Sequence, residues 1–520
     1  MLSKTTAVKS FKPLLLARPL TSESNDKYQY LQQSKVPSDV FPRSLPRLPI
    51  PKLQSTCDRY LATQKALQNE ATFETTAKAV KAFMSEQGPQ LDKKLRAQDK
   101  ANKHTSYISP YWFDMYLSDR RPVAFTHNPG LSLSDDPRPE FARNTAKRAA
   151  NLLISALRFH KSLKANVLLP DAFHMKPSET NTDSFWNKVK WMPKSVATYL
   201  AYAMNVYPLD MSQFANLLQS TRIPMQGKDV IQRFPDSKHV LVLSKGCFYT
   251  FDAYDNNGSL FEPNYYYSCI KEVQGKKGKS QGLGVMTSTD RDSWSNTRQH
   301  LVSLGNEEAL KAIDSALFAI CLDDHWEFKG DNNEEIVAEL CCGSVPENRW
   351  FDKSFSMIFS KNGTVGLNFE HAWGDGVAVM RFFDDILTDS SKNAFITNET
   401  MKEVNVQEIT FRIDDQVEAA IEKAKIDHLE RLSSVEFKAY QRFGFGKNQC
   451  KKAKVGPDAI MQLAFQIAHL RLYDGKFGPT YESCSTAIFR HGRTETVIKD
   501  IIENVTVFKM PFFVFHRSGH

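Results

Sequence analysis

The sequence predicts an α/β fold, and three patterns along the chain support this class. Residues 53–100 place apolar side chains near helical spacing, residues 239–252 alternate about a turn as a β-hairpin does, and residues 354–387 change from alternation to helical spacing. Strand and helix patterns therefore alternate through the middle of the chain, which is typical of α/β proteins. A chain of 520 residues has room for several domains, at roughly 100–200 residues each, or for one large two-lobed enzyme.

The composition is that of a globular protein. Hydrophobic residues make up 41% of the chain and charged residues 24%, which excludes a collagen-like, coiled-coil or largely disordered protein. No stretch approaches the roughly 18 consecutive apolar residues of a transmembrane helix, so any membrane association is expected at the surface. The net charge of +8 is mild for this length and suits anionic metabolites or an anionic lipid surface, whereas a nucleic-acid binder would concentrate its basic residues in a recognisable module.

The cysteines indicate reduced thiols rather than a disulfide or metal framework. None of the eight stands in a C-x-x-C pair, so we expect an intracellular compartment and no zinc or other metal site. They are Cys57, Cys247, Cys269, Cys321, Cys341, Cys342, Cys450 and Cys484.

The first residues resemble a mitochondrial transit peptide. From Met1 to Ser22 the chain carries basic and hydroxyl side chains, and its first acidic residue is Glu23. The apolar run within this segment is too short for a secretory signal or a membrane anchor. A basic, disordered terminus is the alternative. We expect residues 1–40 to form a transit peptide and linker, and the proline-punctuated run from Leu45 to mark the start of the folded part.

The segment from Trp186 to Tyr207 combines aromatic side chains with lysines, and no acidic residue interrupts it. A basic, aromatic, amphipathic segment of this kind is able to lie in the headgroup region of an anionic bilayer. It is equally consistent with a helical hairpin that packs on the body of the protein and keeps its lysines in water. The residues alone leave both interpretations open.

Two turn-rich segments follow in the middle of the chain. The alternating apolar residues of 239–252 surround Lys245-Gly246, which predicts a β-hairpin turning at that pair. Residues 276–284 are glycine-rich and basic. Their Gly-Leu-Gly sequence is a weak signal for a phosphate-binding loop and is more typical of a mobile surface loop.

The stretch from Ser354 to Leu387 is the most informative part of the chain. Alternating apolar residues surround Asn362-Gly363, a pair expected to adopt positive φ in a tight hairpin. From Val379 onward the apolar residues take helical spacing. The stretch therefore predicts two strands followed by an amphipathic helix.

His371 lies where the second of these strands ends and the helix begins. An imidazole at such a junction is able to face a cleft from a rigid backbone, and its unperturbed pKa of about 6.5 suits a general base near neutral pH. Asp375, four residues later, either orients the imidazole or shapes the turn. A histidine among aromatic residues is often a hydrogen-bonded packing residue, so the residues alone leave a catalytic and a structural role open.

Residues 437–457 carry basic side chains and no acidic one. The basic residues are Lys438, Arg442, Lys447, Lys451, Lys452 and Lys454. Pro457 and Asp458 follow, and proline suits the first position of a helix. Lysines gathered before a helix start are able to bind a phosphorylated ligand, and a solvated basic loop is the alternative.

Two hydroxyl-rich stretches, residues 480–486 and 494–496, lie on either side of Arg493. Closely spaced hydroxyl groups with an arginine are able to recognise a small carboxylate. A polar strand with a turn explains the same residues equally well.

Together these stretches and several further blocks resemble the choline/carnitine acyltransferase family. The likeness runs from about Leu45 to about Val497. The further blocks are Leu45–Pro51, Tyr111–Leu117, Arg222–Pro224, Asp290–Trp294 and Asn348–Lys353. Several independent blocks in one order are far more specific than any single motif.

The resemblance implies a two-lobed fold of the chloramphenicol-acetyltransferase type, with mixed sheets flanked by helices and a ligand tunnel between the lobes. It implies that His371 is the general base for direct acyl transfer between CoA and L-carnitine, with Asp375 in support. CoA and acyl-CoA are substrates in this reaction, as carnitine is, and neither a bound cofactor nor a metal is expected.

The resemblance also assigns the binding residues. CoA is expected along Lys447, Lys451, Lys452 and Asp458. Lys447 and Lys451 match phosphate-binding positions, and the aspartate lies near the pantetheine arm. The carnitine carboxylate is expected near Tyr481, Ser483 and Thr494.

The implied domain order has a helical segment at residues 41–105 that packs on the second lobe, followed by a catalytic lobe at 106–413. A second lobe at 414–497 carries the CoA and carnitine motifs and is expected to be incomplete, with a divergent tail at 498–520. In the long-chain branch of the family an insert corresponding to about 178–208 is associated with a membrane. This favours membrane contact for the basic, aromatic segment.

The likeness is greatest to the mitochondrial long-chain branch. The expected partners are therefore long-chain acyl-CoA, L-carnitine and the matrix side of the inner mitochondrial membrane, bound peripherally, with no nucleic acid. One alternative is a medium- or short-chain carnitine acyltransferase, because no short motif in the chain sets the acyl length. The other is an inactive CoA-binding or membrane-associated truncated form.

Overall fold

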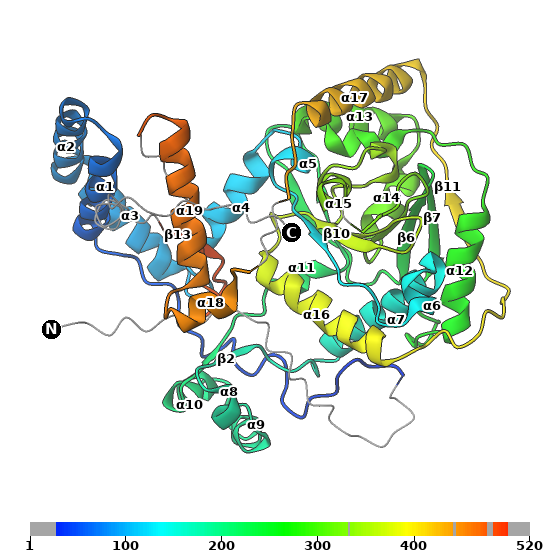
Figure 1. Ribbon diagram of the computed structural model, residues 1–520, viewed down its shortest axis with the longest axis horizontal. Helices are drawn as coiled ribbons and strands as arrows, with labels where there is room; N and C mark the ends of the chain where they lie inside the picture. The colour runs from blue at the N-terminus through cyan, green and yellow to red at the C-terminus, as the bar shows by residue number, and fades with distance from the viewer. Residues whose placement is uncertain (1–27, 331–332, 440–443, 476–481, 498–520) are drawn as a thin grey trace. The chain divides into compact units, whose positions relative to one another are not determined.

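The computed structural model describes residues 28–330, 333–439, 444–475 and 482–497 (Figure 1). They fall into two compact units. The large unit comprises residues 28–45 and 110–439, and the small unit comprises residues 46–109, 444–475 and 482–497. Most of the predicted transit peptide, residues 1–27, lies outside the described part of the chain.

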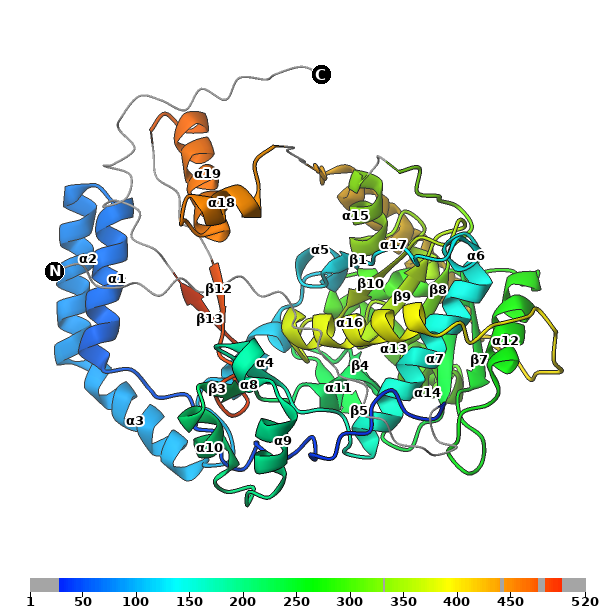
Figure 2. The same ribbon diagram turned by 60° about the horizontal axis from the view of Figure 1, so that its bottom comes forward.

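A mixed seven-stranded sheet forms the centre of the large unit (Figure 2). Its order is β1 (Gly130–Ser132), β10 (Val365–Phe369), β9 (Phe355–Phe359), β8 (Ala319–Leu322), β6 (His239–Ser244), β7 (Cys247–Asp252) and β11 (Gln407–Ile409). The pairs β6–β8 and β8–β9 are parallel, and the other neighbours are antiparallel. With helices on both sides, this sheet confirms the α/β class that the sequence predicts.

Both faces of the sheet are buried. Val240 and Val242 of β6 belong to one core cluster, and Leu241 and Leu243 belong to the other. This alternation follows from the two-residue period of a strand, which sends successive side chains to opposite faces. A strand that buries both faces reads as a continuous apolar run, as β6 does.

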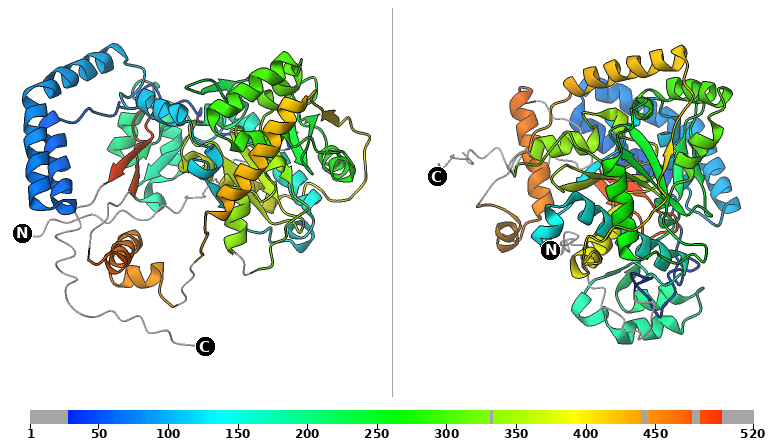
Figure 3. Two further views of the ribbon diagram at one scale, coloured as in Figure 1. Left: turned by 90° about the horizontal axis from the view of Figure 1, so that it is seen from above. Right: turned by 90° about the vertical axis from the view of Figure 1, so that its right-hand side faces the viewer.

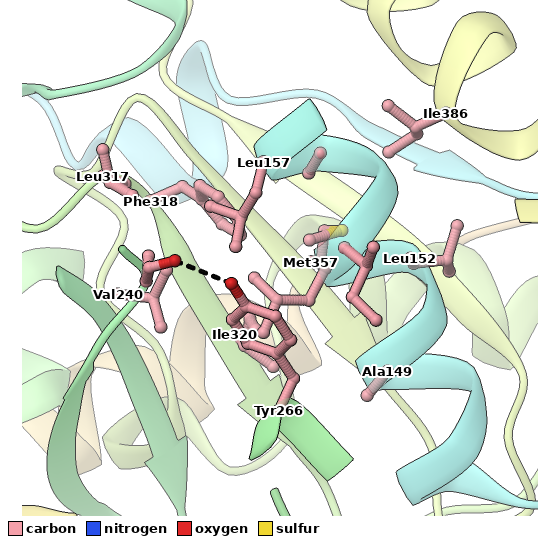
Figure 4. Packing of buried hydrophobic residues seen from close by; sticks show 14 of the residues in the cluster. Ala149, Leu152, Leu157, Val240, Tyr266, Leu317, Phe318, Ile320, Met357 and Ile386 are labelled. Carbon is pink, nitrogen blue, oxygen red and sulfur yellow. Dashed lines mark hydrogen bonds between the residues drawn. The ribbon is translucent and has the colours of Figure 1, made fainter. Parts of the chain in front are cut away.

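Helices supply the other half of each core. The first face packs against α7 (Thr145–Lys164), α12 (Pro263–Gly275) and α16 (Gly376–Lys392). Figure 4 shows Leu152 and Leu157 of α7 pointing toward Ile320 and Met357 of the sheet. The second face packs against η1 (Leu283–Ser288), α13 (Arg291–Ser303), α14 (Glu307–Ser315), α15 (Asn333–Cys341) and α17 (Asp415–Ser433). The last of these lies against α13 (Figure 3).

The predicted hairpin at Lys245-Gly246 is confirmed. β6 and β7 pair from His239 opposite Asp252 to the turn, where Lys245 has φ 52° and Gly246 has φ 72°. Two successive positive φ values define a type I′ turn, whose twist matches that of the paired strands.

The hairpin around Asn362-Gly363 is also confirmed, but the expectation of positive φ at both residues is wrong. Gly363 has φ 88°, whereas Asn362 does not have a positive φ. The carbonyl of Ser360 accepts a hydrogen bond from the N–H of Gly363 at 3.1 Å, so the chain turns before the glycine. Only the last residue of such a turn needs the left-handed conformation, which glycine adopts without strain.

Shorter elements complete the large unit. Its other helices are α4 (Ser109–Ser118), α5 (Val123–Thr126), α6 (Pro139–Ala142), α8 (Pro177–Thr180), α9 (Asp183–Lys190), α10 (Ala197–Ala203), α11 (Phe214–Leu217) and η2 (Pro346–Asn348), with Ser109 alone assigned to the small unit. Two small antiparallel sheets pair β2 (Ala172–His174) with β3 (Val206–Pro208) and β4 (Ser220–Ile223) with β5 (Val230–Arg233).

The described residues from 28 to 41 pack on the large unit. The backbone N–H of Ser34 donates to the carbonyl of Val167 at 2.7 Å, just beyond the end of α7. Phe41 is buried in a small core together with Phe185 of α9. This part of the expected linker is therefore a bound segment with its own apolar contacts.

The glycine-rich segment 276–284 lies on the large unit and packs tightly at each of its three glycines. A Cβ atom on Gly284 would lie 2.3 Å from the carbonyl oxygen of Glu347, and one on Gly278 would lie 2.7 Å from the hydroxyl of Tyr249. The segment runs directly into η1, whose side chains are buried. Close packing against neighbouring elements accounts for these glycines without a phosphate-binding role.

The small unit contains helices and a two-stranded ribbon. Its elements are α1 (Leu53–Leu67), α2 (Glu70–Ser85), α3 (Gln87–Ala101), α18 (Lys447–Lys452), α19 (Pro457–Leu472), β12 (Glu482–Ser485) and β13 (Thr494–Val497). The helices predicted over residues 53–100 are confirmed, and so is Pro457 as the first residue of a helix. The N–H of Arg490 donates to the carbonyl of Pro46 at 2.7 Å, which joins the two ends of this unit.

Two further features concern the membrane and the cysteines. No helix in this part of the chain is both long and apolar enough to cross a membrane. All the cysteines identified in the sequence lie in this part, and each is a free thiol.

Candidate active site

His371 occupies the junction between β10 and α16. The carbonyl of Ser354 anchors this junction to the sheet, because it accepts hydrogen bonds from the N–H of Glu370 at 3.1 Å and from the indole of Trp373 at 2.8 Å. Glu370 and Trp373 are buried, whereas His371 is partly exposed. The residue is therefore partly exposed while its backbone is held by the sheet, at the strand-to-helix position that the sequence predicts.

Aromatic rings surround the imidazole. The ring of Tyr116 on α4 stacks on it, with centroids 5.2 Å apart and planes inclined by 13°, and the ring of Phe369 lies 5.4 Å away. Tyr116 also meets the ring of His127 edge-on at 5.1 Å. His127 is held in turn by Asp119, whose carboxylate lies 2.8 Å from Nε2.

Asp375 is oriented by Gln213, which precedes α11. The amide oxygen of Gln213 accepts the N–H of Asp375 at 2.7 Å, and its amide nitrogen donates to Oδ2 of Asp375 at 3.1 Å. Gly374 packs against the same amide, since a Cβ atom there would lie 3.1 Å from the amide oxygen. Asp375 occupies the N-cap position of α16, but its side chain makes no capping hydrogen bond to that helix. The Gln213 contacts therefore help to orient the carboxylate.

Sequence reasoning missed Tyr116 and Gln213 as site residues. Tyr116 lies in one of the blocks that carry the family resemblance, but no spacing rule connects a helix residue with a histidine so much later in the chain. Gln213 stands in no recognisable pattern. Only the tertiary fold brings these side chains to His371 and Asp375.

A buried ion network lies behind His371. Glu370 accepts a hydrogen bond from Arg222 at 3.0 Å, Arg222 and Arg291 both donate to Asp229, at 2.6 and 2.7 Å, and Arg291 reaches Asp352 at 2.8 Å. These side chains are at most 2% exposed. Burial opposes ionisation of Asp229, but the two arginines outweigh it and hold the pKa of that carboxyl below its usual value. Three blocks that are separate in the sequence thus meet beside the site.

The predicted CoA residues lie in the small unit, on α18 and in the first turn of α19. Lys447 is partly exposed, and Lys451, Lys452 and Asp458 are exposed. Lys447 and Lys451 stand four residues apart and therefore share one face of α18. This arrangement presents positive charge at a surface that an anionic ligand is able to reach.

The predicted carnitine residues lie on the ribbon of the small unit. Ser483 on β12 pairs with Thr496, and Thr494 on β13 pairs with Ser485. Opposite residues of an antiparallel pair share a face, so Ser483 and Thr494 lie diagonally on one face of the ribbon. Tyr481 lies outside the described residues.

One cluster in the described part of the chain has the residue types of a metal site. The ligand atoms of Asp323, His325 and Glu339 lie within 4.8 Å of one another. However, the guanidinium of Arg349 forks onto both carboxylate oxygens of Asp323 at 2.7 Å and lies 3.6 Å from Glu339. The guanidinium of Arg349 balances the negative charge of these carboxylates, so we interpret the cluster as a structural ion pair.

Comparison with known proteins identifies the family to which this chain is similar. A family model described as "Choline/Carnitine o-acyltransferase" matches residues 48–509. "Carnitine O-palmitoyltransferase 2, mitochondrial" of Mus musculus is 43% identical over 488 residues, which cover 92% of this chain and 73% of that protein. The Homo sapiens protein of the same name is 42% identical over 490 residues, with the same two coverages of 92% and 73%.

A more distant relative matches over a similar share of the chain. The "Putative mitochondrial carnitine O-acetyltransferase" of Saccharomyces cerevisiae is 29% identical over 532 residues, which cover 87% of this chain and 72% of that protein. The family match spans most of the chain, including both the strand-to-helix junction of His371 and the segments of the small unit. The chain therefore belongs to the choline/carnitine O-acyltransferase family.

Proposed function

We propose that this protein is a carnitine O-palmitoyltransferase, which transfers long-chain acyl groups reversibly between CoA and L-carnitine for mitochondrial fatty acid β-oxidation. The observation that supports this most strongly is the 43% identity to the mouse protein of that activity over 92% of the chain. The acetyltransferase relative, at 29% identity, is considerably more distant.

In the proposed reaction His371 is the general base. It accepts the proton of the carnitine hydroxyl while that oxygen attacks the carbonyl carbon of the acyl-CoA thioester. The C–S bond of the resulting tetrahedral intermediate then breaks, and the departing CoA sulfur takes the proton back from the imidazolium. The reverse reaction follows the same steps with the CoA thiol as nucleophile. Acyl group and proton balance between the two substrates, so the transfer needs no further cofactor.

Asp375 supports the base electrostatically in this proposal. The imidazolium that forms during the reaction is stabilised by a carboxylate that the protein has already oriented. Gln213 gives that orientation through two hydrogen bonds to Asp375, one to its backbone and one to Oδ2. The amide is neutral, so it directs the carboxylate without cancelling its charge. The quaternary ammonium of carnitine is able to stabilise the oxyanion of the intermediate.

The substrate-binding residues remain those that the family resemblance assigns. We propose that Lys447, Lys451 and Lys452 bind CoA, with Lys447 and Lys451 at its phosphates, and that Asp458 lies near the pantetheine arm. We propose that Tyr481, Ser483 and Thr494 bind the carnitine carboxylate. The fold is proposed to be of the two-lobed chloramphenicol-acetyltransferase type, with His371 in the catalytic lobe and these motifs in the second.

Membrane contact is proposed for the surface formed by α9, α10 and the turn between them. Trp191 is 78% exposed and Tyr199 is 62% exposed, and the ammonium of Lys190 lies 5.3 Å from the Trp191 ring centroid. The other side of α9 is buried through Phe185 and Val189. Exposed aromatic rings beside lysines are typical of a surface that seats in lipid headgroups. We therefore propose peripheral association with the matrix side of the inner mitochondrial membrane.

The test of this function is turnover against a ladder of acyl donors. The protein is incubated with L-carnitine and acetyl-, octanoyl- or palmitoyl-CoA, and the released CoA thiol is measured. We expect the highest kcat/KM with palmitoyl-CoA. An optimum at octanoyl- or acetyl-CoA would replace the proposal with a medium- or short-chain enzyme. Binding of CoA without any turnover would identify an inactive CoA-binding form.

A further inference from the structure

Each of the three guanidinium nitrogens of Arg222 on β4 donates a hydrogen bond to a different residue near the site. The residue is 1% exposed. Its Nε donates to Asp229 at 2.6 Å, its Nη1 donates to Glu370 at 3.0 Å, and its Nη2 donates to the backbone carbonyl of Tyr116 at 2.9 Å. A planar guanidinium holds such contacts in a fixed relative geometry.

The contact with Glu370 controls the backbone of His371. Glu370 precedes His371, and both of its carboxylate oxygens lie 3.1 Å from the N–H of Ala372, the residue that follows. The side chain therefore spans the histidine from one side to the other. Arg222 fixes this carboxylate, and the carboxylate fixes the direction in which the chain presents the imidazole.

The contact with Tyr116 controls the ring on which the imidazole stacks. Arg222 binds the backbone carbonyl of the same residue whose ring lies 5.2 Å from the imidazole centroid at a plane angle of 13°. Tyr116 and His371 come from α4 and from the β10–α16 junction. The two residues stack directly on one another. Arg222 links them a second time, because it donates hydrogen bonds both to the backbone of Tyr116 and to the side chain of Glu370.

We infer that Arg222 is a positioning residue for the reaction: its guanidinium sets the imidazole of His371 against the ring of Tyr116. This inference rests on the proposed role of His371 as general base. The stacked ring restricts the orientation of the imidazole, and a general base acts only within hydrogen-bond distance of the proton that it accepts. A base displaced by about 1 Å from its reacting proton loses on the order of 100-fold in rate.

The test compares Arg222→Lys with Arg349→Lys in the full chain. Arg349 is a matched control, because it is also 1% exposed in the large unit and forks onto Asp323 at 2.7 Å for both contacts. Lysine keeps the charge in each case but replaces the planar fork with a single ammonium. Both variants are expected to unfold at a lower temperature than the wild type. A difference in activity between them therefore reports the position of the imidazole rather than a general loss of stability.

Two kinetic readouts separate the variants. For Arg222→Lys we expect kcat to fall about 10- to 100-fold while the KM values for palmitoyl-CoA and L-carnitine stay within about twofold. Arg349→Lys is expected to keep both kcat and the two KM values within about twofold of the wild type.

A third readout needs no turnover. The Cε1–H resonance of His371, identified by its absence from the spectrum of His371→Ala, is shifted by the ring current of the stacked Tyr116. We expect this shift to disappear in Arg222→Lys and to persist in Arg349→Lys. If Arg222→Lys does not fold, Glu370→Gln takes its place, since it keeps the side-chain shape while weakening the contact with Arg222. It is expected to reduce the ring-current shift and to lower kcat.

The inference is overturned if Arg222→Lys retains both kcat and the His371 resonance, or if Arg349→Lys loses kcat by the same factor. It is also overturned if Glu370→Gln, used as the replacement, leaves the resonance in place. If His371→Ala retains turnover, the proposed role of the base fails, whereas the difference in resonance between the two arginine variants still decides whether Arg222 positions the imidazole.

Discussion

At the scale of single residues, burial separates the histidines of the large unit into two groups. Burial lowers the pKa of His160, His174 and His428 to about 4 in each case. His160 is fully enclosed, with Nδ1 2.7 Å from the hydroxyl of Tyr254. These imidazoles are neutral structural groups near pH 7. His371 differs because it is partly exposed at a strand-to-helix junction.

The neutral, buried His160 makes stability depend on pH in a defined direction. An unfolded histidine has a pKa of about 6.5, so between about pH 6.5 and 4 the unfolded chain binds a proton that the folded protein excludes. The stability is therefore highest above this window and falls as the pH falls through it, by up to about 1.4 kcal/mol per pH unit for one histidine. We expect His160→Gln to be less stable at neutral pH but to lose stability less steeply on acidification.

Urea unfolding followed by tryptophan fluorescence measures this slope between about pH 7 and 5. His104→Gln is the control, because His104 is exposed and its replacement is expected to keep the wild-type slope. A wild-type slope in His160→Gln would show that its burial does not contribute to acid sensitivity.

Among the site residues, the sequence predicts the position of His371 but not the side chains that contact it. The strand-to-helix position of His371 follows from local alternation and helical spacing. The contacts from Gln213 to Asp375 and from Tyr116 to His371 depend on the packing of α4, α11 and the β10–α16 junction, and no local pattern encodes that packing. Arg222 was visible only as part of a family block, without its three-way contact.

At the scale of elements, Gly284 in the 276–284 segment has no room for a Cβ atom, whereas Gly275 of α12 does. A Cβ atom on Gly284 would lie 2.3 Å from the carbonyl oxygen of Glu347 and 2.6 Å from that of Arg349, and neither backbone is free to move without disturbing η2. A Cβ atom on Gly275, the last residue of α12, would meet nothing within 4 Å.

We therefore expect Gly284→Ala to cost about 1–3 kcal/mol or more in unfolding free energy, through overpacking. The matched Gly275→Ala is expected to be neutral or to stabilise by up to about 1 kcal/mol, because alanine restricts the unfolded chain. Calorimetric unfolding of both variants checks this. Equal losses in the two variants would mean that the segment is not packed at Gly284 in the way described.

The α9–α10 surface allows a second prediction at this scale. Each aromatic ring that leaves water on membrane binding contributes roughly 1 kcal/mol or more, so the double substitution Trp191→Ser and Tyr199→Ser is expected to weaken vesicle binding about tenfold or more. Sedimentation with vesicles containing anionic lipid measures the bound fraction. Tyr60→Ser is the control, because Tyr60 is 49% exposed on α1 of the small unit. Equal vesicle binding by the double variant and the control would contradict the proposal that the α9–α10 surface contacts the membrane.

At the scale of the whole molecule, the α/β class and the individual hairpins were predictable, whereas the order of the sheet was not. β8 lies between β6 and β9, and both of its neighbours are parallel to it. Pairing of this kind joins strands that are distant in sequence, so local spacing carries no information about it. The edge strands β1 and β11 have only three residues each, which is too short for an alternation pattern to be recognised.

The central claim is that the large unit carries the base of a carnitine acyltransferase at the junction of β10 and α16. The measurement that tests it most directly is the turnover of palmitoyl-CoA and L-carnitine by His371→Ala, beside the exposed control His104→Ala. We expect kcat of His371→Ala to fall roughly 100- to 10,000-fold, with the unfolding temperature and the affinity for CoA unchanged and the control fully active. Turnover by His371→Ala within a few-fold of the wild type would contradict the account.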